Sequence, residues 1–501
     1  MISSVLDENI RLVEEAFKDC GDFVKRKLPI GRNKDIWLYV AYMDMLVSRD
    51  TLEGQVLDHL MIFLWENPPR EENLKEHLFE TLKDGVTTAD IQVSEDMGEI
   101  REAILSGDTV IFVDGCARAM LVSTKGWPSR GVSATDSEVV VQGSKDAFTE
   151  SFRVNTTLVR RRIKDSKLKV KQFKVGKRTL TSVGLMYLED VVRKDVLRDA
   201  ESRIESIDID AILDSGYIAQ LIEDDWKSPF PQSQVTERPD KASAAILEGR
   251  IVVVVDNSPF VLIIPATMNT FFQASDDYYQ NWEIMSFARL IRFAAGFMAA
   301  SLPGLYIAIA CFHPSMIPML LIFKMAGARQ AVPFPAVAEM LLMDLAFELL
   351  REAGIRLPGP IGHAIGIVGG LIIGQAAVEA GLVSPIVVII VALSGMSSFA
   401  IPHVSLVAGF RLTKYLLLAC SAVLGLFGFW MGALFTLIHL ATLKSFGLPY
   451  LFPFVSGDIN CYSDMKDTLF RVPLFAMKKR PIFANPSESV RIGPHDARVK
   501  E

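Results

Sequence analysis

Residues 357–440 carry only three formally charged side chains, which are Glu379, Arg411 and Lys414. One helix needs about 20 consecutive apolar residues to cross the hydrocarbon core of a bilayer. A run of 84 residues is therefore long enough for three crossings. This feature predicts an integral membrane protein whose second half forms an α-helical transmembrane domain.

Glycines are spaced four apart in the first predicted helix of this run, at Gly362, Gly366, Gly370 and Gly374. This spacing places them on one helix face that has almost no side chains. Helices in a membrane associate through close packing, which small residues allow. We expect these four glycines to be helix-packing residues.

Composition separates the chain into two halves. The first 280 residues are rich in Lys, Arg, Asp and Glu, whereas apolar residues are concentrated in the second half. The net charge of −7 does not favour a nucleic-acid partner. The five cysteines are far apart and form no CxxC pair, which argues against a disulfide framework and a zinc site. Residues 1–17 lack the basic start and apolar run of a secretory signal, so we expect the first half to stay in the cytosol.

We expect the N-terminal half to be a two-part α/β, or α+β, soluble region. Its first subdomain, residues 1–123, is predicted to be helix-rich, because apolar residues recur at three- and four-residue spacing in Ile36–Met45 and Leu52–Leu64. Asp114 and Gly115 lie between two apolar runs and predict a β-hairpin. A linker rich in Gly, Ser, Thr and Pro follows at 124–143.

The second soluble subdomain, residues 141–280, is predicted to be α/β. Residues 168–174 alternate apolar and basic side chains, as is typical of a half-exposed strand. Further strands are expected at 183–188, 251–255 and 260–264, and helices at 191–206 and 208–224.

Aromatic side chains gather just before the first predicted transmembrane helix. They are Phe271, Phe272, Tyr278, Tyr279 and Trp282. Aromatic residues of this kind prefer the boundary between lipid headgroups and hydrocarbon. We interpret them as interfacial anchors, and the alternative is a capping helix on the soluble core.

The transmembrane domain is assigned to residues 284–443, with about four spans. The amphipathic helix predicted at Pro335–Arg351 carries three acids, which disfavours a lipid-facing span and favours a surface-lying or re-entrant arrangement. An even number of spans leaves the tail, residues 444–501, in the cytosol. The four spans are expected at Phe287–Phe312, Ile361–Ala380, Leu382–Ile401 and Leu412–Leu440.

No catalytic constellation is evident, so we expect neither an enzyme nor a cofactor or bound metal. Gly176 and Lys177 resemble a phosphate-binding loop only faintly, because Lys171 stands where that motif has glycine. Residues 160–178 hold ten Lys or Arg and a single acid, Asp165. This basic run forms either a solvated strand and turn or a contact with anionic lipid or an acidic partner.

Polar side chains inside the apolar run are the candidate pore or gate residues. Gln375 and Glu379 are four apart, hence on one helix face, and Ser394, Ser397 and Ser398 form a polar patch on the next helix. They serve either hydrogen bonding between helices or a water-filled path for cations. A path would require several subunits around an axis, because one copy of three or four helices cannot enclose much water.

A series of motifs runs through residues 30–475. They are Ser228-Pro-Phe-Pro-Gln232, Thr236-Glu-Arg-Pro-Asp-Lys241, Ser258-Pro-Phe-Val261, Ser275-Asp-Asp-Tyr-Tyr279, Val332-Pro-Phe-Pro335, Glu348-Leu-Leu-Arg-Glu-Ala-Gly-Ile-Arg-Leu-Pro358 and Gly374-Gln-Ala-Ala-Val-Glu-Ala380. In sequence and order they resemble the GerA family of bacterial spore germination proteins, and the chain is most similar to the A subunit of a germinant receptor. A related sporulation protein, stage V protein AF, shares much of the same region.

The resemblance implies a multi-pass protein of the spore inner membrane, with its N-terminal domain on the cytoplasmic or core side. It implies a homo-oligomer, a pentamer, whose centre conducts monovalent cations when nutrient binds. Two partners are implied, a transporter-like B-type membrane subunit and a C-type lipoprotein subunit. The competing hypothesis is a non-conducting scaffold that assembles the same partners.

Overall fold

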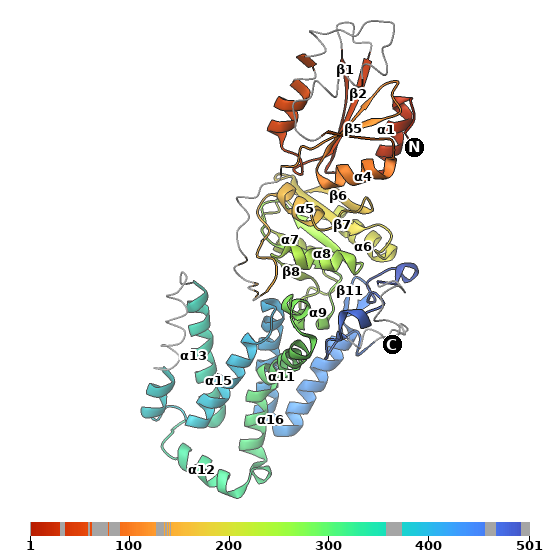
Figure 1. Ribbon diagram of the computed structural model, residues 1–501. Coiled ribbons are helices and arrows are strands. Elements are labelled where there is room, and N and C mark those ends of the chain that lie inside the picture. Colours follow the sequence, from red (N-terminus) through yellow and green to blue (C-terminus); the bar gives the residue numbers. More distant parts are fainter. Residues whose placement is uncertain are drawn as a thin grey trace, which may run out of the picture. The chain divides into compact units, whose positions relative to one another are not determined.

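The computed structural model describes residues 2–30, 36–58, 61–62, 79, 91–126, 135, 138, 140, 142–356, 373–455 and 467–491. The chain divides into two compact units (Figure 1). The α/β unit comprises Met1–Glu223, Ser233–Pro265 and Met477–Glu501, and the helical unit comprises Asp224–Gln232 and Ala266–Ala476.

The first half of the α/β unit is built on a five-stranded antiparallel sheet. Its order is β1 (Phe23–Ile30), β2 (Ile36–Met43), β4 (Thr109–Val113), β5 (Ala119–Val122) and β3 (Ile91–Ser94). Helices α1 (Leu6–Ala16) and α4 (Met97–Ser106) pack on one face, and the π-helical segment Thr51–Leu57 packs on the other. The hairpin predicted at Asp114 and Gly115 is confirmed as the β4–β5 connection.

The helix predicted at Ile36–Met45 is wrong, because this segment is strand β2. Tyr39 and Ala41 face the core beneath α1 and α4, whereas Leu38 and Val40 face the core on the opposite side. A strand buried on both faces has a nearly continuous apolar sequence, and such a run contains the three- and four-residue spacings of a helix. The first subdomain is therefore a sheet with helices packed on it rather than helix-rich.

The second half of the α/β unit is a second five-stranded antiparallel sheet. Its order is β6 (Leu168–Val175), β7 (Thr181–Leu188), β9 (Ile251–Val255), β10 (Val261–Ile264) and β8 (Gln234–Thr236). Helices α5 (Phe152–Arg160) and α8 (Pro239–Leu247) cover one face, while α6 (Lys194–Glu205) and α7 (Ser215–Ile222) contact β6 and β10. The predicted strands and the two predicted helices are confirmed, with shorter bounds for the helices.

A buried ion pair joins the two sheets. The Arg160 side chain is 1% exposed and donates from Nη2 to Asp22 Oδ1 at 2.7 Å and from Nη1 to the Leu168 carbonyl at 3.2 Å. Burial by itself lowers the pKa of the Arg160 guanidinium, but the charge of Asp22 and its hydrogen bonds raise that pKa above its ordinary value. The backbone N–H of Gly21 also donates to the Val170 carbonyl at 3.0 Å, so the pair lies beside a direct backbone link between the sheets.

The predicted tail, 444–501, is divided between the two units. Residues 444–455 and 467–476 belong to the helical unit. The later segment packs on the second sheet instead, where Asn485 N–H donates to the Val191 carbonyl at 2.7 Å and Ala484 bridges Val192.

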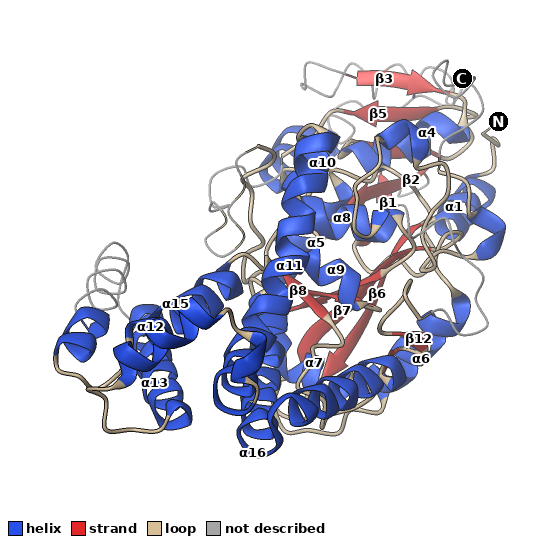
Figure 2. Ribbon diagram, turned by 90° about the horizontal axis from the view of Figure 1, so that it is seen from below, coloured by secondary structure: helices blue, strands red, loops and turns tan. Residues whose placement is uncertain are grey.

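The helical unit contains α11 (Trp282–Ile307), α12 (Met319–Arg329), α13 (Ala336–Arg356), α15 (Pro385–Phe399) and α16 (Val404–Thr442) (Figure 2). Of the described part of the chain, Trp282–Phe312 and Val404–Thr442 are long and apolar enough to cross a membrane, and Pro385–Phe399 is a shorter apolar helix. Most of the predicted span 361–380 lies outside the described residues. Residues 373–379, at its end, are helical.

Helix α16 is folded back on itself at Gly425. This residue has φ 61° and ψ −138°, a non-helical conformation that glycine adopts without strain from a side chain. After the turn, Gly432 packs against Leu417 of the preceding arm. A Cβ built on Gly432 would lie 3.0 Å from Leu417 Cδ2. Leu440 also shares a core with Phe410. The single span predicted at Leu412–Leu440 is therefore wrong, since two antiparallel arms, residues 404–424 and 426–442, occupy this segment.

In chain order, α11, α15 and the two arms of α16 alternate in direction. Phe293 and Ala300 of α11 share a core with both ends of α16, whereas Phe312, after the far end of α11, lies against Gly425 at the hairpin turn. Helix α15 runs opposite to α11, because Ser394 lies against Ala299 and Val387 packs with Ile307. Three helical segments, α11 and the two arms of α16, thus extend over a similar length.

We expect Gly428→Ala to disrupt this hairpin. A Cβ at Gly428 would overlap the carbonyl oxygen of Cys420 in the other arm, whereas Gly327 in α12 has open space around it. Overpacking of this kind costs about 1–3 kcal/mol or more, because backbone has to move. Thermal aggregation of the detergent-solubilised chain should start at a clearly lower temperature for Gly428→Ala than for the control Gly327→Ala. Equal temperatures for the two variants would contradict the packed hairpin.

Candidate functional site

The serine patch predicted on α15 is held by hydrogen bonds inside the helical unit. Ser394 Oγ donates to the Ala299 carbonyl at 3.1 Å, which links α15 to α11. Ser398 Oγ donates to the Gly395 carbonyl at 2.6 Å and accepts from Arg351 Nη2 at 2.9 Å. Ser397 is partly exposed. For Ser394 and Ser398 the observed contacts are those of helix packing.

Gln375 and Glu379 lie together on the exposed side of the short helical stretch 373–379. Gln375 Nε2 donates to Glu379 Oε1 at 2.8 Å, and both side chains are exposed. The other side of this stretch faces α15, since a Cβ built on Gly374 would lie 3.4 Å from Val388 Cγ1. The remaining glycines of the predicted packing face, Gly362, Gly366 and Gly370, lie outside the described residues.

A group of charged side chains lies inside the helical unit, between α13 and the first arm of α16. We call Asp344, Glu348, Arg351, Arg411 and Lys414 the inner charge cluster. Lys414 Nζ is 2.7 Å from Asp344 Oδ1 and 3.4 Å from Glu348 Oε1, and Arg411 Nη1 is 3.2 Å from Glu348 Oε2. The side chains of Lys414 and Asp344 are 6% and 3% exposed. Such a cluster holds α13 and α16 together through charged side chains that are largely buried inside the unit.

Arg351 attaches α13 to the end of α15. Its guanidinium lies 5.2 Å from the Phe347 ring and 5.3 Å from the Phe399 ring, within the range of cation–π attraction. It also donates to Glu348 and to Ser398. This arginine therefore serves both the cluster and the packing of α13 on α15.

The third acid of α13, Glu339, is also buried and partnered. Its side chain is 0% exposed, accepts from the Ser384 backbone N–H at 2.9 Å and lies 3.3 Å from Arg329 Nη2. The surface-lying arrangement predicted for Pro335–Arg351 rested on the cost of acids facing lipid. All three acids face cations within the unit, so the cost toward lipid on which that prediction rested does not arise, and α13 packs as a member of the helix bundle.

Sequence reasoning missed this cluster although a signal was present. Arg411 and Lys414 are the two cations within the 84-residue apolar run, and they are three residues apart, hence on one helix face. Two buried cations on one face require acids on a neighbouring helix. The predicted helix Pro335–Arg351 offers three such acids, Glu339, Asp344 and Glu348.

A second buried charge group ties the aromatic junction to the start of α11. Arg289 is 0% exposed and lies 3.1 Å from Asp277 Oδ2 and 2.8 Å from Asp467 Oδ1. Arg292 Nη1 reaches Asp277 Oδ1 at 2.7 Å, and the Tyr278 hydroxyl donates to Asp467 Oδ2 at 2.7 Å. The segment before α11 and the segment near residue 467 are thus both attached to this helix.

The predicted interfacial anchors divide into two groups. Phe271 and Phe272 are fully buried. Phe271 meets the His403 ring edge-on and lies near Tyr450, and Phe272 stacks on Phe293. These two side chains form core rather than surface. Tyr279 and Trp282 are 43% and 42% exposed, as an anchor would be. Tyr278 is partly buried within the charge group just described.

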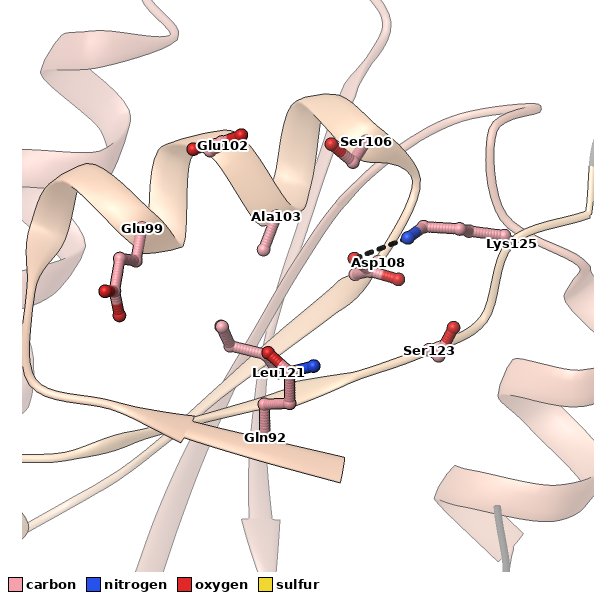
Figure 3. Close-up of a pocket in the computed structure, with 9 residues that line it drawn as sticks. All are labelled: Gln92, Glu99, Glu102, Ala103, Ser106, Asp108, Leu121, Ser123 and Lys125. Carbon is pink, nitrogen blue, oxygen red and sulfur yellow. Dashed lines mark ion pairs between the residues drawn. The ribbon is translucent and has the colours of Figure 1, made fainter. Parts of the chain in front are cut away.

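The α/β unit has an open polar hollow of about 380 Å³ beside α4 (Figure 3). Lys125 points toward Asp108, 3.2 Å away, and so is already paired. Glu102 and Ser106 lie on the side of α4 that faces away from Gln92 and Leu121 (Figure 3). The arrangement does not converge on one point, and we assign no ligand to it. Within the described residues no group of three or more His, Cys, Asp or Glu side chains could hold a metal ion.

The basic run 160–178 does not form one surface. Arg160 is buried in the ion pair with Asp22, and Lys169 Nζ donates to the Ala16 carbonyl at 3.0 Å. Lys177 and Arg178, by contrast, are exposed and paired with Asp208 and Asp210. The run thus serves structure at one end and lies in solvent at the other.

The chain thus combines a mixed α/β unit with an apolar helical unit whose charges are paired internally. These features define a class of two-part, membrane-associated proteins, and the described residues contain no enzyme-like site. A comparison with protein families is more specific. The model for the Bacillus/Clostridium GerA spore germination protein matches residues 11–483, and the chain belongs to this family.

Three relatives show how far the similarity extends. Spore germination protein KA of Bacillus subtilis (strain 168) is 38% identical, over 98% of this chain and 89% of the relative. Spore germination protein GerLA of Bacillus cereus is 38% identical, over 81% of this chain and 82% of the relative. The crystal structure of the N-terminal domain of the A subunit of the Bacillus megaterium spore germinant receptor GerK3 is 34% identical and covers 53% of this chain and 97% of that domain, with a TM-score of 0.43.

Proposed function

We propose that this chain is an A-type subunit of a nutrient germinant receptor and that several copies form a cation channel gated by nutrient. Family membership supports the role in spore germination. The observation that carries the channel proposal is the exposed Gln375–Glu379 pair within the long apolar run of the helical unit. A carboxylate facing hydrocarbon is costly, so this surface should face water or another subunit.

The alternating helices support a unit that crosses the bilayer several times. The two arms of α16 are about 32 Å and 26 Å long at 1.5 Å per residue, close to the thickness of the hydrocarbon core. With α11, α13, the predicted helix 361–380, α15 and both arms, the proposal has six crossings instead of the four predicted. Six is again an even number, so both chain ends stay on one side, which we assign to the cytoplasmic or core side of the spore inner membrane.

Assembly is proposed to include further subunits. A ring of copies, a pentamer by resemblance, would place the Gln375–Glu379 surfaces around an axis through which monovalent cations leave. The transporter-like B-type subunit and the C-type lipoprotein would bind nutrient and complete the receptor. Nutrient can open the ring only if the complex binds it more tightly in the open arrangement.

Glu379→Gln tests the channel directly. The change removes a negative charge and keeps the size of the side chain, so nutrient-triggered potassium release should slow about tenfold if Glu379 attracts cations at a pore mouth. Release is measured from spores in which the variant replaces the native chain, and Glu283→Gln, at another exposed acid of the helical unit, is the control. Unchanged release and unchanged ion preference in Glu379→Gln would remove this residue from the pore and favour the scaffold hypothesis.

A further inference from the structure

The charges of the inner charge cluster do not balance. Asp344 and Glu348 supply two negative charges, whereas Arg351, Arg411 and Lys414 supply three positive ones. Charge that is removed from water has to be paired, because an uncompensated ion in an apolar environment is costly. Among the five members of the cluster, no acid balances the third cation.

The excess charge lies where two arginines share one oxygen. Arg351 Nη1 and Arg411 Nη1 are 3.3 Å and 3.2 Å from Glu348 Oε2. Lys414 reaches the other oxygen of this carboxylate at 3.4 Å and holds Asp344 more closely, at 2.7 Å. One carboxylate therefore faces three cations. An anion with several oxygens can bind both guanidinium groups in addition, because each presents a planar fork of N–H donors.

One of these guanidinium groups can be reached from outside the helical unit. We call Arg351 and Arg411 the arginine pair. Their side chains are 10% and 33% exposed. Arg411 donates from Nη1 to Glu348, and its side chain makes no further hydrogen bond to the described residues. The rest of its fork is therefore available to a group outside the unit.

Large apolar side chains are exposed beside the arginine pair. Phe399, at the end of α15, is 68% exposed, and its ring lies 5.3 Å from the Arg351 guanidinium. Leu412, next to Arg411 in α16, is 60% exposed. Arg411 is seven residues after the start of α16, about 10 Å along the helix axis, a depth from which an arginine side chain extends to the headgroup level. The place thus offers cationic donors and an apolar surface together.

We propose that the arginine pair binds the phosphate of an anionic phospholipid, with Phe399 and Leu412 against its acyl chains. Basic pockets between membrane helices bind anionic headgroups in this way. The negative charge of the lipid balances the cluster, and the acyl chains cover apolar side chains that a free anion would leave bare. The inference goes beyond the proposed function and needs only that the helical unit lies in a bilayer.

Lipid binding by the full chain in detergent tests this site. Phosphatidylglycerol and phosphatidylcholine with the same acyl chains are added in equal amounts, and the retained lipid is counted by native mass spectrometry. Phosphatidylglycerol should be retained in preference. Arg411→Met removes one guanidinium while Glu348 keeps Arg351 and Lys414, and the apparent affinity for phosphatidylglycerol should fall about fivefold. Lys324→Met, at an exposed cation of α12, is the control and should leave the affinity unchanged.

Equal retention of the two lipids, or equal affinity in Arg411→Met and the unchanged chain, overturns the proposal. Inorganic phosphate in excess should not displace the lipid, because it makes no contact with Phe399 or Leu412. Displacement by phosphate would show a simple anion site and would also overturn the lipid assignment. If Arg411→Met instead breaks up an oligomer without changing lipid retention, the counter-charge comes from a second copy and the proposal fails.

Amide hydrogen exchange gives a measurement that needs no variant. Added phosphatidylglycerol should slow exchange in residues 398–412, which contain Phe399 and Leu412, and should leave α12 unchanged, whereas phosphatidylcholine should have little effect on either. The same exchange with both lipids would contradict a specific site. Since these readouts report lipid binding alone, their failure leaves the channel proposal, which Glu379→Gln tests, undecided by this experiment and separately testable.

Discussion

Replacing Arg160 with methionine should increase amide hydrogen exchange in strand β6 by about 100-fold or more, since each 1.4 kcal/mol changes an opening equilibrium tenfold. The substitution leaves Asp22 buried without its cation, and breaking a buried pair in this way costs about 3–5 kcal/mol. Asp22 is 4% exposed and cannot turn to solvent without opening the contact between the sheets. Exchange is followed by mass spectrometry on peptides from β1 and β6 of the full chain in detergent.

Two controls separate burial from charge. Arg178→Met removes the exposed pair with Asp210, and exposed pairs contribute so little that exchange should change by no more than about threefold. The double variant Asp22→Leu with Arg160→Met removes both charges, so most of the protection should return, because apolar residues often replace a buried pair without loss. Equal exchange in Arg160→Met and Arg178→Met would show that this pair does not hold the sheets together.

The second sheet was predictable from sequence because its signals are local. In β6 apolar and basic side chains alternate, and β9 and β10 are β-branched runs separated by Asp256-Asn257-Ser258-Pro259, which breaks any helix. Strand β2 was not predictable in the same way. Its two faces meet two different cores, and nothing within Ile36–Met43 indicates that helices cover both sides.

The hairpin of α16 illustrates a limit of hydropathy. The sequence around Gly425 is as apolar as the arms, so composition continues through the turn and indicates one long helix. What makes the turn is the conformation of one glycine and the small residues Gly428 and Gly432, which let the arms approach. The glycine spacing at 362–374 predicts close helix packing, and Gly425, Gly428 and Gly432 carry the same kind of signal.

Part of the candidate site could be predicted from the sequence, because that part depends on a local pattern. Gln375 and Glu379 were found because a spacing of four is a local pattern, and they do lie together. The inner charge cluster joins Asp344 to Lys414, 70 residues apart, and only the packing of α13 on α16 brings them into contact. Pairing of this kind cannot be read from either helix alone, although the excess of acids in one and of cations in the other is complementary.

Lys414→Met should have the largest effect within the helical unit. It leaves Asp344 buried among apolar helices with its one described ion-pair partner removed, a loss of about 3–5 kcal/mol by comparison with other buried pairs. We expect the yield of monodisperse, detergent-solubilised chain to fall at least about tenfold, and nutrient-triggered potassium release from spores to fall with it. Lys414→Arg keeps the charge and should retain most of the yield.

The arginine one turn before Lys414 gives a matched comparison. Arg411→Met removes a cation from the same helix, but Arg411 is 33% exposed, and Glu348 keeps both Lys414 and Arg351 as partners. Its effect on yield should therefore be several-fold smaller. Adding Asp344→Asn to Lys414→Met removes the stranded charge, and the yield should recover substantially even though the ion pair is gone. If the double variant is as poorly folded as Lys414→Met, the cost lies in lost packing by the lysine stem, and the unpaired carboxylate is not its cause.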